Sequence, residues 1–360
     1  MADLQHETFT ERGYFPEIPS TAVLGYDGSW IQIDRGQWLQ HKLSRPSPDF
    51  MVVKVSTNVL AHSQKRHQLY VFRALSADIS DIISRRNIPV AIVTSGAIGL
   101  GHKARENYRY RNQSIYPDSD DTNQQRSIDS IIGQPLLTAH WESALHEFGL
   151  AAEERLLVHA DLMDKRKRKG TLDSLCKSID AGKILLVNED DARSYEELEI
   201  DPETQSFGDN DRLSALLAIG ISQHHGFRHP LLVNLTSVNG LYTPQGFYEG
   251  NPNQLIRLVR DTTGLEDDFR AQLAELQARP DYKPPRTGRG IGGEMSKLSA
   301  SIQAANSGID VVVCNGEVAL HDRPVVEGEE QFDFRRFRPL QAVIYKLLVG
   351  TRFEARLLKD

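Results

Sequence analysis

The amino-acid sequence predicts an α/β protein with a doubly wound, mainly parallel sheet flanked by helices in a three-layer sandwich. From Phe50 onward, short apolar runs of strand length alternate with longer segments that show helical periodicity. Hydrophobic residues make up 39% of the chain and charged residues 25%, which is typical of a soluble protein with a sizeable core. We expect one such domain over residues 50–360, preceded by an extension of unknown role over residues 1–49.

Six apolar runs have the length and composition of buried strands. They lie at residues 51–55, 90–94, 154–158, 184–188, 230–235 and 310–314. Amphipathic segments between them predict helices at residues 69–86, 128–148, 211–222, 264–277 and 294–307. Two polar stretches, residues 102–127 and 243–253, interrupt the pattern and are typical of surface insertions or active-site flaps.

Charge and cysteine content narrow the functional classes. The formal net charge of −7 argues against a nucleic acid or an anionic membrane as partner, and small-molecule substrates fit better. The sequence has no apolar run of about 18 residues and no apolar signal-peptide region, so we expect a chain that is neither exported nor membrane-spanning. Cys176 and Cys314 lie in apolar patterns, which argues against a disulfide framework and for a cytoplasmic location.

The most informative stretch is residues 206–215, where two acids and an amide crowd a glycine immediately before a helical pattern. Upstream, residues 184–191 form a buried-strand pattern that ends in an amide and carboxylates. In α/β proteins, polar groups at the carboxyl end of a buried strand commonly carry the chemistry. The two stretches resemble the GDND and NEND motifs of glutamate 5-kinases, which belong to the amino acid kinase superfamily.

Further segments resemble motifs of the same family, in the family order. They correspond to its opening strand with the phosphate loop, amino-acid-binding loop, GQ helix start, LTDxxGLY nucleotide segment, GTGGMxTK loop and terminal VGTxF, at residues 50–60, 92–99, 132–137, 235–242, 290–297 and 349–353. The resemblance covers roughly residues 50–353, an extent that chance does not explain. The family often carries a small C-terminal RNA-binding-like domain after the kinase, and we expect none here.

The resemblance implies an ATP-dependent, magnesium-requiring kinase. Its acceptor would be the γ-carboxylate of L-glutamate, and its product L-glutamyl 5-phosphate would feed proline biosynthesis. The implied catalytic residues are Lys54, Lys297 and Asp211, the aspartate orienting both lysines. Mg²⁺ would be held through the ATP phosphates, with no protein metal site. ATP and an amino acid are then the small-molecule partners, and we expect a homo-oligomer.

The resemblance also divides the remaining residues between two subsites. The implied amino-acid-binding residues are Ser95, Gly96, Ala97, Asp191 and Asn210. The implied nucleotide-binding residues are Lys54, Ser56, Thr57, Thr236, Ser237, Gly290, Gly292, Gly293 and Lys297. These residue types suit the ligands, because acids can bind an ammonium group and backbone N–H groups at a helix start can bind a carboxylate or a phosphate.

The chemistry itself requires positive charge rather than a base. The side chain of glutamate has a pKa near 4.3, so it is already ionised at neutral pH. Phosphoryl transfer places negative charge on oxygens that lysines, backbone N–H groups and magnesium stabilise. Plainer interpretations exist: Lys54 could be a strand-end lysine that reaches solvent, Lys297 could follow a glycine linker, and Asp211 and Ser95 could be helix caps.

Four positions depart from the family motifs. Ser56 replaces a glycine of the phosphate loop, and Ser237 replaces the aspartate of the nucleotide segment. Asp190 replaces the second asparagine of NEND, and Glu294 stands where methionine is usual. These departures leave two alternatives open: an acyl kinase for a different amino acid or conjugate in a specialised pathway, and a non-catalytic amino-acid-binding sensor.

Residues 165–169 are five consecutive basic residues in place of a longer family segment. Such a run can be a nucleic-acid patch or an import signal. Since the whole chain is acidic and the run lies inside the kinase-like region, we favour a solvated helix start or a positive rim for anionic ligands.

Overall fold

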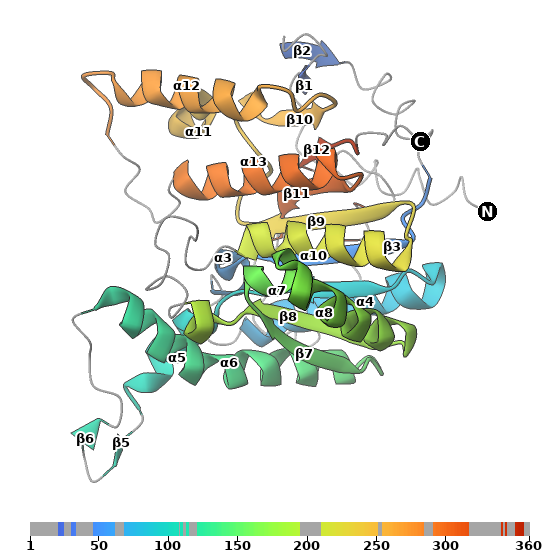
Figure 1. Cartoon of the computed structure of the whole chain (residues 1–360). Helices are drawn as coiled ribbons and strands as arrows, with labels where there is room; N and C mark the ends of the chain where they lie inside the picture. The colour runs from blue at the N-terminus through green and yellow to red at the C-terminus, as the bar shows by residue number, and fades with distance from the viewer. Residues whose placement is uncertain are drawn as a thin grey trace, which may run out of the picture.

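A ten-stranded sheet runs through the molecule in the order β2-β1-β10-β12-β11-β9-β3-β4-β8-β7 (Figure 1). In chain order its strands are β1 (Thr21–Leu24), β2 (Trp30–Ile33), β3 (Phe50–Val55), β4 (Val90–Val93), β7 (Ala152–Leu157), β8 (Ile184–Glu189), β9 (Pro230–Thr236), β10 (Ile256–Val259), β11 (Asp310–Asn315) and β12 (Thr351–Phe353). The structure, a computed structural model, describes residues 21–24, 30–33, 46–61, 68–107, 109–110, 113–114, 121–194, 210–250, 254–283, 291–316, 340, 343 and 350–355.

The sheet is mainly parallel, as predicted. Among the described strands of this ten-stranded sheet, only the β1/β2 and β11/β12 neighbours are antiparallel. The six predicted strands are β3, β4, β7, β8, β9 and β11, each within two residues of its predicted bounds. Every residue of β3, β4, β8 and β9 is buried, which is why these strands read as continuous apolar runs: helices cover both faces of a parallel sheet.

Helices form a layer on each face of the sheet (Figure 1). One layer contains α7 (His159–Met163), α8 (Lys165–Asp180), α10 (Asn210–His225), α12 (Leu265–Gln277) and α13 (Ile291–Asn306). The other contains α3 (Thr57–Ala61), α4 (Gln68–Arg86) and α6 (Thr122–His146). Alternate residues of β3 enter the two cores, with Phe50 and Val52 in the first and Met51 and Val53 in the second. The predicted three-layer α/β architecture is confirmed.

Several elements lie where the sequence predicted none. In the first polar stretch, the end of α5 (Ala97–Arg105) is followed by a small antiparallel pair, β5 (Arg109–Tyr110) with β6 (Gln113–Ser114). α6 begins six residues before its predicted start, because the carboxylate of Asp121 accepts hydrogen bonds from two N–H groups of the first turn. The second polar stretch contains α11 (Pro244–Glu249).

The region assigned to an extension contributes to the same sheet. β1 pairs with β10 in parallel and β2 pairs with the other side of β1, so these two strands extend the sheet beyond β10. Within the described parts of the chain, no helix has the length and apolar character needed to cross a membrane. Cys176 and Cys314 are both buried with free thiols.

Two glycines allow α5 and α6 to cross in close contact. A Cβ atom on Gly133 of α6 would lie 1.8 Å from the carbonyl oxygen of Ala97, and one on Gly101 of α5 would lie 1.6 Å from the carbonyl oxygen of Asp129. Both clashes are with backbone, which cannot rotate away. The loop that leads into α5 is thereby fixed against α6.

We predict that Gly133→Ala destabilises the protein by about 3 kcal/mol, because the added methyl group forces the two helices apart. Gly99→Ala in the same α5 helix is the matched control, since nothing lies within 4 Å of its Cβ position. The control should be neutral, or more stable by up to about 1 kcal/mol, because alanine favours the helix. Urea unfolding of both variants tests this; equal midpoints for the two would contradict the close crossing.

Candidate active site

Three charged side chains from distant parts of the chain meet at the centre of the sheet. Lys54 is the fifth residue of β3, Asp211 lies in the first turn of α10, and Lys297 lies in the second turn of α13. The Nζ atom of Lys54 lies 2.5 Å from Oδ1 of Asp211, and the Nζ atom of Lys297 lies 3.2 Å from Oδ2. Lys54 and Asp211 are only 5% and 6% exposed. The structure therefore brings together the three residues predicted to be catalytic.

The electrostatics of this cluster suit an anionic ligand. Burial acts to raise the pKa of Asp211, but Lys54 and then Lys297 outweigh it and hold the pKa below its ordinary value. The carboxylate is thus ionised at neutral pH. Among these three residues, two ammonium groups face one carboxylate, so Lys54, Asp211 and Lys297 together carry a net positive charge in a buried setting that suits an anion such as a phosphate.

Most of the predicted nucleotide residues lie around this cluster. β3 and β9 are neighbours, so Ser56 after β3 and Thr236 at the end of β9 lie at the same edge of the sheet. The backbone N–H of Ser56 donates to the carbonyl of Leu235 at 3.0 Å. Ser237 is also buried, whereas Thr57 begins α3 and is exposed.

The glycine-rich loop differs from its predicted form. Gly292 and Gly293 lie inside the first turn of α13, which begins at Ile291, rather than before the helix. Lys297 therefore lies one turn into the helix, and its Nζ atom donates to the carbonyl of Gly293 at 3.1 Å. Gly290 lies outside the described residues. The start of a helix still presents free backbone N–H groups beside the lysine.

Glu294 is a second buried acid, after Asp211, at this cluster. Its side chain is 5% exposed, and it accepts a hydrogen bond from the backbone N–H of Tyr242. Its Oε2 atom is buried and has no hydrogen-bond partner. Burial raises the pKa of Glu294 to about 7, although the nearby Lys297 acts in the opposite direction.

The predicted amino-acid residues lie at the ends of the next two strands. Ser95, Gly96 and Ala97 follow β4, and Asp191 follows β8, which pairs with β4. Gly96 caps α5 with a φ of 109°, a left-handed conformation that favours glycine and turns the chain into the helix. Ser95 is buried, and Asn210 opens α10 directly before Asp211.

Asp191 has a partner that the sequence did not reveal. Its Oδ2 atom accepts a hydrogen bond of 2.7 Å from the hydroxyl of Ser130 in α6. Burial raises the pKa of Asp191 to about 6, and the Ser130 hydrogen bond and the charge of Arg126 oppose that rise only in part. No pattern in the chain singles out Ser130, since only the tertiary contact between α6 and the end of β8 makes it relevant.

Two hydrogen-bond networks support this side of the site. Asn188 donates to the side-chain carbonyl of Gln134 at 2.8 Å, and the amide of Gln134 donates to Glu154 at 2.8 Å. Arg193 donates from both terminal nitrogens to Asp161, each at 3.2 Å. Gln134 belongs to the GQ stretch noted in the sequence, whereas nothing there indicated the Arg193 pair.

The basic run forms the start of α8. The Nζ atom of Lys167 lies 3.9 Å from Oδ1 of Asp161, and the guanidinium of Arg168 donates to the side-chain oxygen of Gln223 in α10 at 3.1 Å. Asp164 caps the helix by accepting from the N–H of Arg166 at 2.7 Å. Through Asp161, the run adjoins the Arg193 pair on the amino-acid side of the site, while the role of the run stays a prediction.

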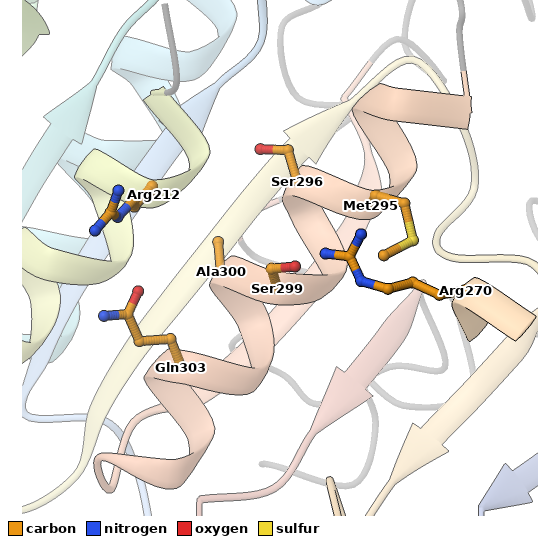
Figure 2. A pocket seen from close by; sticks show the side chains of 7 residues that line it. All are labelled: Arg212, Arg270, Met295, Ser296, Ser299, Ala300 and Gln303. Carbon is orange, nitrogen blue, oxygen red and sulfur yellow. The ribbon is translucent and has the colours of Figure 1, made fainter. Parts of the chain in front are cut away.

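A pocket of about 320 Å³ lies between α10, α12 and α13. Figure 2 shows the side chains that line it. Its lining residues are Arg212, Arg270, Met295, Ser296, Ser299, Ala300 and Gln303. None of the predicted site residues is among them. Arg270 pairs with Glu266 at 2.6 Å, and Ser299 donates to the same carboxylate at 2.8 Å, so part of the polar lining is already engaged within the protein.

Comparison with known families decides the kinship of the chain. Residues 49–315 match the Amino acid kinase family, well over half of the 360 residues. The chain belongs to the amino acid kinase family.

Sequence identities with individual amino acid kinases show that the relationship is remote. Glutamate 5-kinase from Shewanella woodyi is 30% identical over 280 residues, covering 77% of this chain and 63% of that protein. Glutamate 5-kinase from Pectobacterium atrosepticum is 29% identical over 308 residues, covering 85% and 68%. The chain thus spans about two thirds of the length of these curated relatives. Isopentenyl phosphate kinase from T. acidophilum, solved as a product complex, has a TM-score of 0.44 and 14% identity, covering 85% of this chain and 100% of that one.

The buried Asp191 carboxylate should make stability depend on pH. The folded chain keeps this proton up to about pH 6, whereas an unfolded aspartate loses it near pH 3.8. Wild-type stability should therefore fall by about 2 kcal/mol, through this group, as the pH rises from 4 to 7. Asp191→Asn has no ionisable group at this position, so its free energy of unfolding should rise relative to that of wild type over the same pH range. Urea unfolding of both at pH 4.5 and 7.5 measures the difference, and a gap that does not change with pH would contradict it.

Proposed function

We propose that this protein is an ATP-dependent kinase that phosphorylates the γ-carboxylate of L-glutamate to give L-glutamyl 5-phosphate, an intermediate of proline biosynthesis. The observation that carries the proposal is the buried cluster in which Asp211 binds Lys54 and Lys297 at 2.5 Å and 3.2 Å. Its positive charge suits a phosphoryl group that is being transferred. Membership of the amino acid kinase family and the similarity to glutamate 5-kinases support the same class of reaction.

The reaction follows from the charges of this cluster. A glutamate carboxylate oxygen attacks the γ-phosphorus of ATP, the bond to the β-phosphate oxygen breaks, and ADP leaves with the electron pair of that bond. No proton moves, so no general base is needed. Lys54 and Lys297 stabilise the charge that spreads over the phosphoryl oxygens, and Asp211 positions both lysines. The start of α13 and its two glycines can hold phosphates, where Mg²⁺ bound with ATP would supply further charge neutralisation.

The acceptor would bind where β4 and β8 end. Asp191 and Asn210 offer oxygens to the ammonium group, and Ser95 with the N–H groups of Gly96 and Ala97 offers donors to the α-carboxylate. Asp191 is held by Ser130 at 2.7 Å, which keeps the carboxylate in place without supplying a countercharge. A cationic ammonium group is therefore a suitable partner for it.

A second candidate is an acyl kinase for a different amino acid or conjugate. It is favoured by the Arg193–Asp161 pair, which lies next to Asp190 on the amino-acid side. Asp190 also accepts from the backbone N–H of Arg193 at 3.3 Å, so this rim carries charges that could meet groups beyond a plain glutamate.

Trapping the acyl phosphate with hydroxylamine tests the proposal directly. Purified protein, ATP and Mg²⁺ would be incubated with a panel of amino acids and conjugates, and hydroxamate formation measured for each. Glutamate should give the highest rate. A higher rate with another acceptor would favour the second candidate, and glutamate binding without hydroxamate from any acceptor would favour a non-catalytic sensor.

We predict that Lys54→Ala and Lys297→Ala each lower kcat by about 100-fold or more, with a much smaller change in the KM for glutamate, because each lysine acts mainly on the transition state. Lys183→Ala is the matched control, since Lys183 only pairs with Glu153 at the surface at 2.8 Å. Steady-state kinetics on variants with native melting behaviour makes the comparison. Near-normal turnover in either cluster variant would rule out this mechanism.

A further inference from the structure

Glu294 is a buried acid beside the proposed catalytic cluster that the mechanism described so far does not use. Glu294 lies in the first turn of α13, three residues before Lys297, so the two side chains lie on the same side of the helix. One carboxylate oxygen accepts from the N–H of Tyr242, while Oε2 is buried without a partner. A desolvated carboxylate oxygen without a partner is costly, and a bound cation or a hydrogen-bond donor would relieve that cost.

The neighbouring groups are already committed. Lys297 donates to Asp211 at 3.2 Å and to the carbonyl of Gly293 at 3.1 Å. Asp211 uses one oxygen for Lys54 and the other for Lys297. Of the two acids beside Lys297, Glu294 is therefore the one with a carboxylate oxygen still available.

A divalent cation matches this oxygen. Mg²⁺ prefers oxygen ligands and is usually bound by one or two carboxylates together with substrate phosphates and water. In the described parts of the chain, no three His, Cys, Asp or Glu side chains are grouped so as to hold a metal ion by themselves. A cation at Glu294 would therefore need the nucleotide phosphates that Lys297 is proposed to bind.

From these observations we infer that Glu294 is a protein ligand of the divalent cation that enters with the nucleotide. The inference rests on the proposed function, because the phosphates supply the other ligands. It differs from the expectation drawn from the sequence, in which the cation is held through the phosphates with no protein ligand.

A purely structural role of Glu294 explains only one of its two carboxylate oxygens. The hydrogen bond from Tyr242 ties α13 to the segment after β9, and a negative charge near a helix start is favourable. Neither effect uses Oε2. Glu294→Gln separates the two roles, because the amide oxygen can still accept from Tyr242 while the negative charge that binds a cation is lost.

The test measures Mn²⁺ binding by electron paramagnetic resonance in the presence and absence of ADP. Wild type should bind Mn²⁺ tightly only with ADP present. Glu294→Gln should weaken Mn²⁺ binding in the ADP complex by about tenfold or more, since loss even of a residue that supports a metal ligand costs 10- to 100-fold in affinity. Glu294→Asp, which keeps a carboxylate, should recover much of the loss. Glu275→Gln, an exposed change on α12, is the matched control and should behave as wild type.

Calorimetry with ADP in the presence of a chelator completes the design. Metal-free ADP should bind wild type and Glu294→Gln with affinities within about twofold. Equal Mn²⁺ affinity in the two ADP complexes would overturn this inference and leave the proposed function standing. The same would follow if Glu294→Gln lost metal-free ADP binding as strongly as Mn²⁺ binding, because that loss would indicate a direct contact with the nucleotide. If wild type binds no nucleotide with or without metal, the proposed function itself fails, and this inference fails with it.

Discussion

The carboxylate of Asp211 holds two buried lysines at once, and the arrangement of the candidate site depends on it. Lys54, Asp211 and Lys297 are separated by more than 80 residues from one to the next, yet their charged atoms lie 2.5 Å and 3.2 Å apart. Without the carboxylate, two like charges would face each other in a desolvated place. The start of α10 further favours a negative charge at this position. The ion pairs therefore link β3, α10 and α13 while leaving a net positive charge for a ligand.

The strand order explains how two subsites can share this cluster. In the strand order β9-β3-β4-β8 all neighbouring strands are parallel, so their carboxyl ends lie at one edge of the sheet. Part of the residues assigned to the nucleotide lie at the ends of β3 and β9, and most of those assigned to the amino acid follow β4 and β8. Lys54, on β3, lies between the two sets. Under the proposed function, the transferred group would pass across the end of β3, where the positive charge is concentrated.

The sequence predicted β3, β4, β8 and β9 well because each is a continuous apolar run buried on both faces. It also predicted the Lys54–Asp211–Lys297 set, which motif resemblance carried and spacing alone could not. It failed where a tertiary contact decides the outcome. Ser130 matters only because α6 passes the end of β8, and the unpaired oxygen of Glu294 becomes evident only once the surrounding groups are in place.

Helix boundaries failed for a more local reason. α13 begins at Ile291 and thus includes two glycines, which have poor helix propensity and therefore read as a loop. α6 starts early because Asp121 caps it, in a stretch too polar to show helical periodicity. In both cases the ends of a helix depend on hydrogen bonds at its first turn, which hydrophobic patterning does not report.

The glycine crossing of α5 and α6 limits how this protein could acquire a different acceptor. Because Gly101 and Gly133 bring two backbones into contact, the packing of α5 on α6 fixes the Ser95–Ala97 loop relative to the helix that carries Ser130. Making room for a larger acceptor by shifting either helix would separate both glycine contacts together. Changes of substrate during evolution or engineering are therefore more accessible through the residues after β8, such as Asp190 and Arg193, which can be altered one side chain at a time.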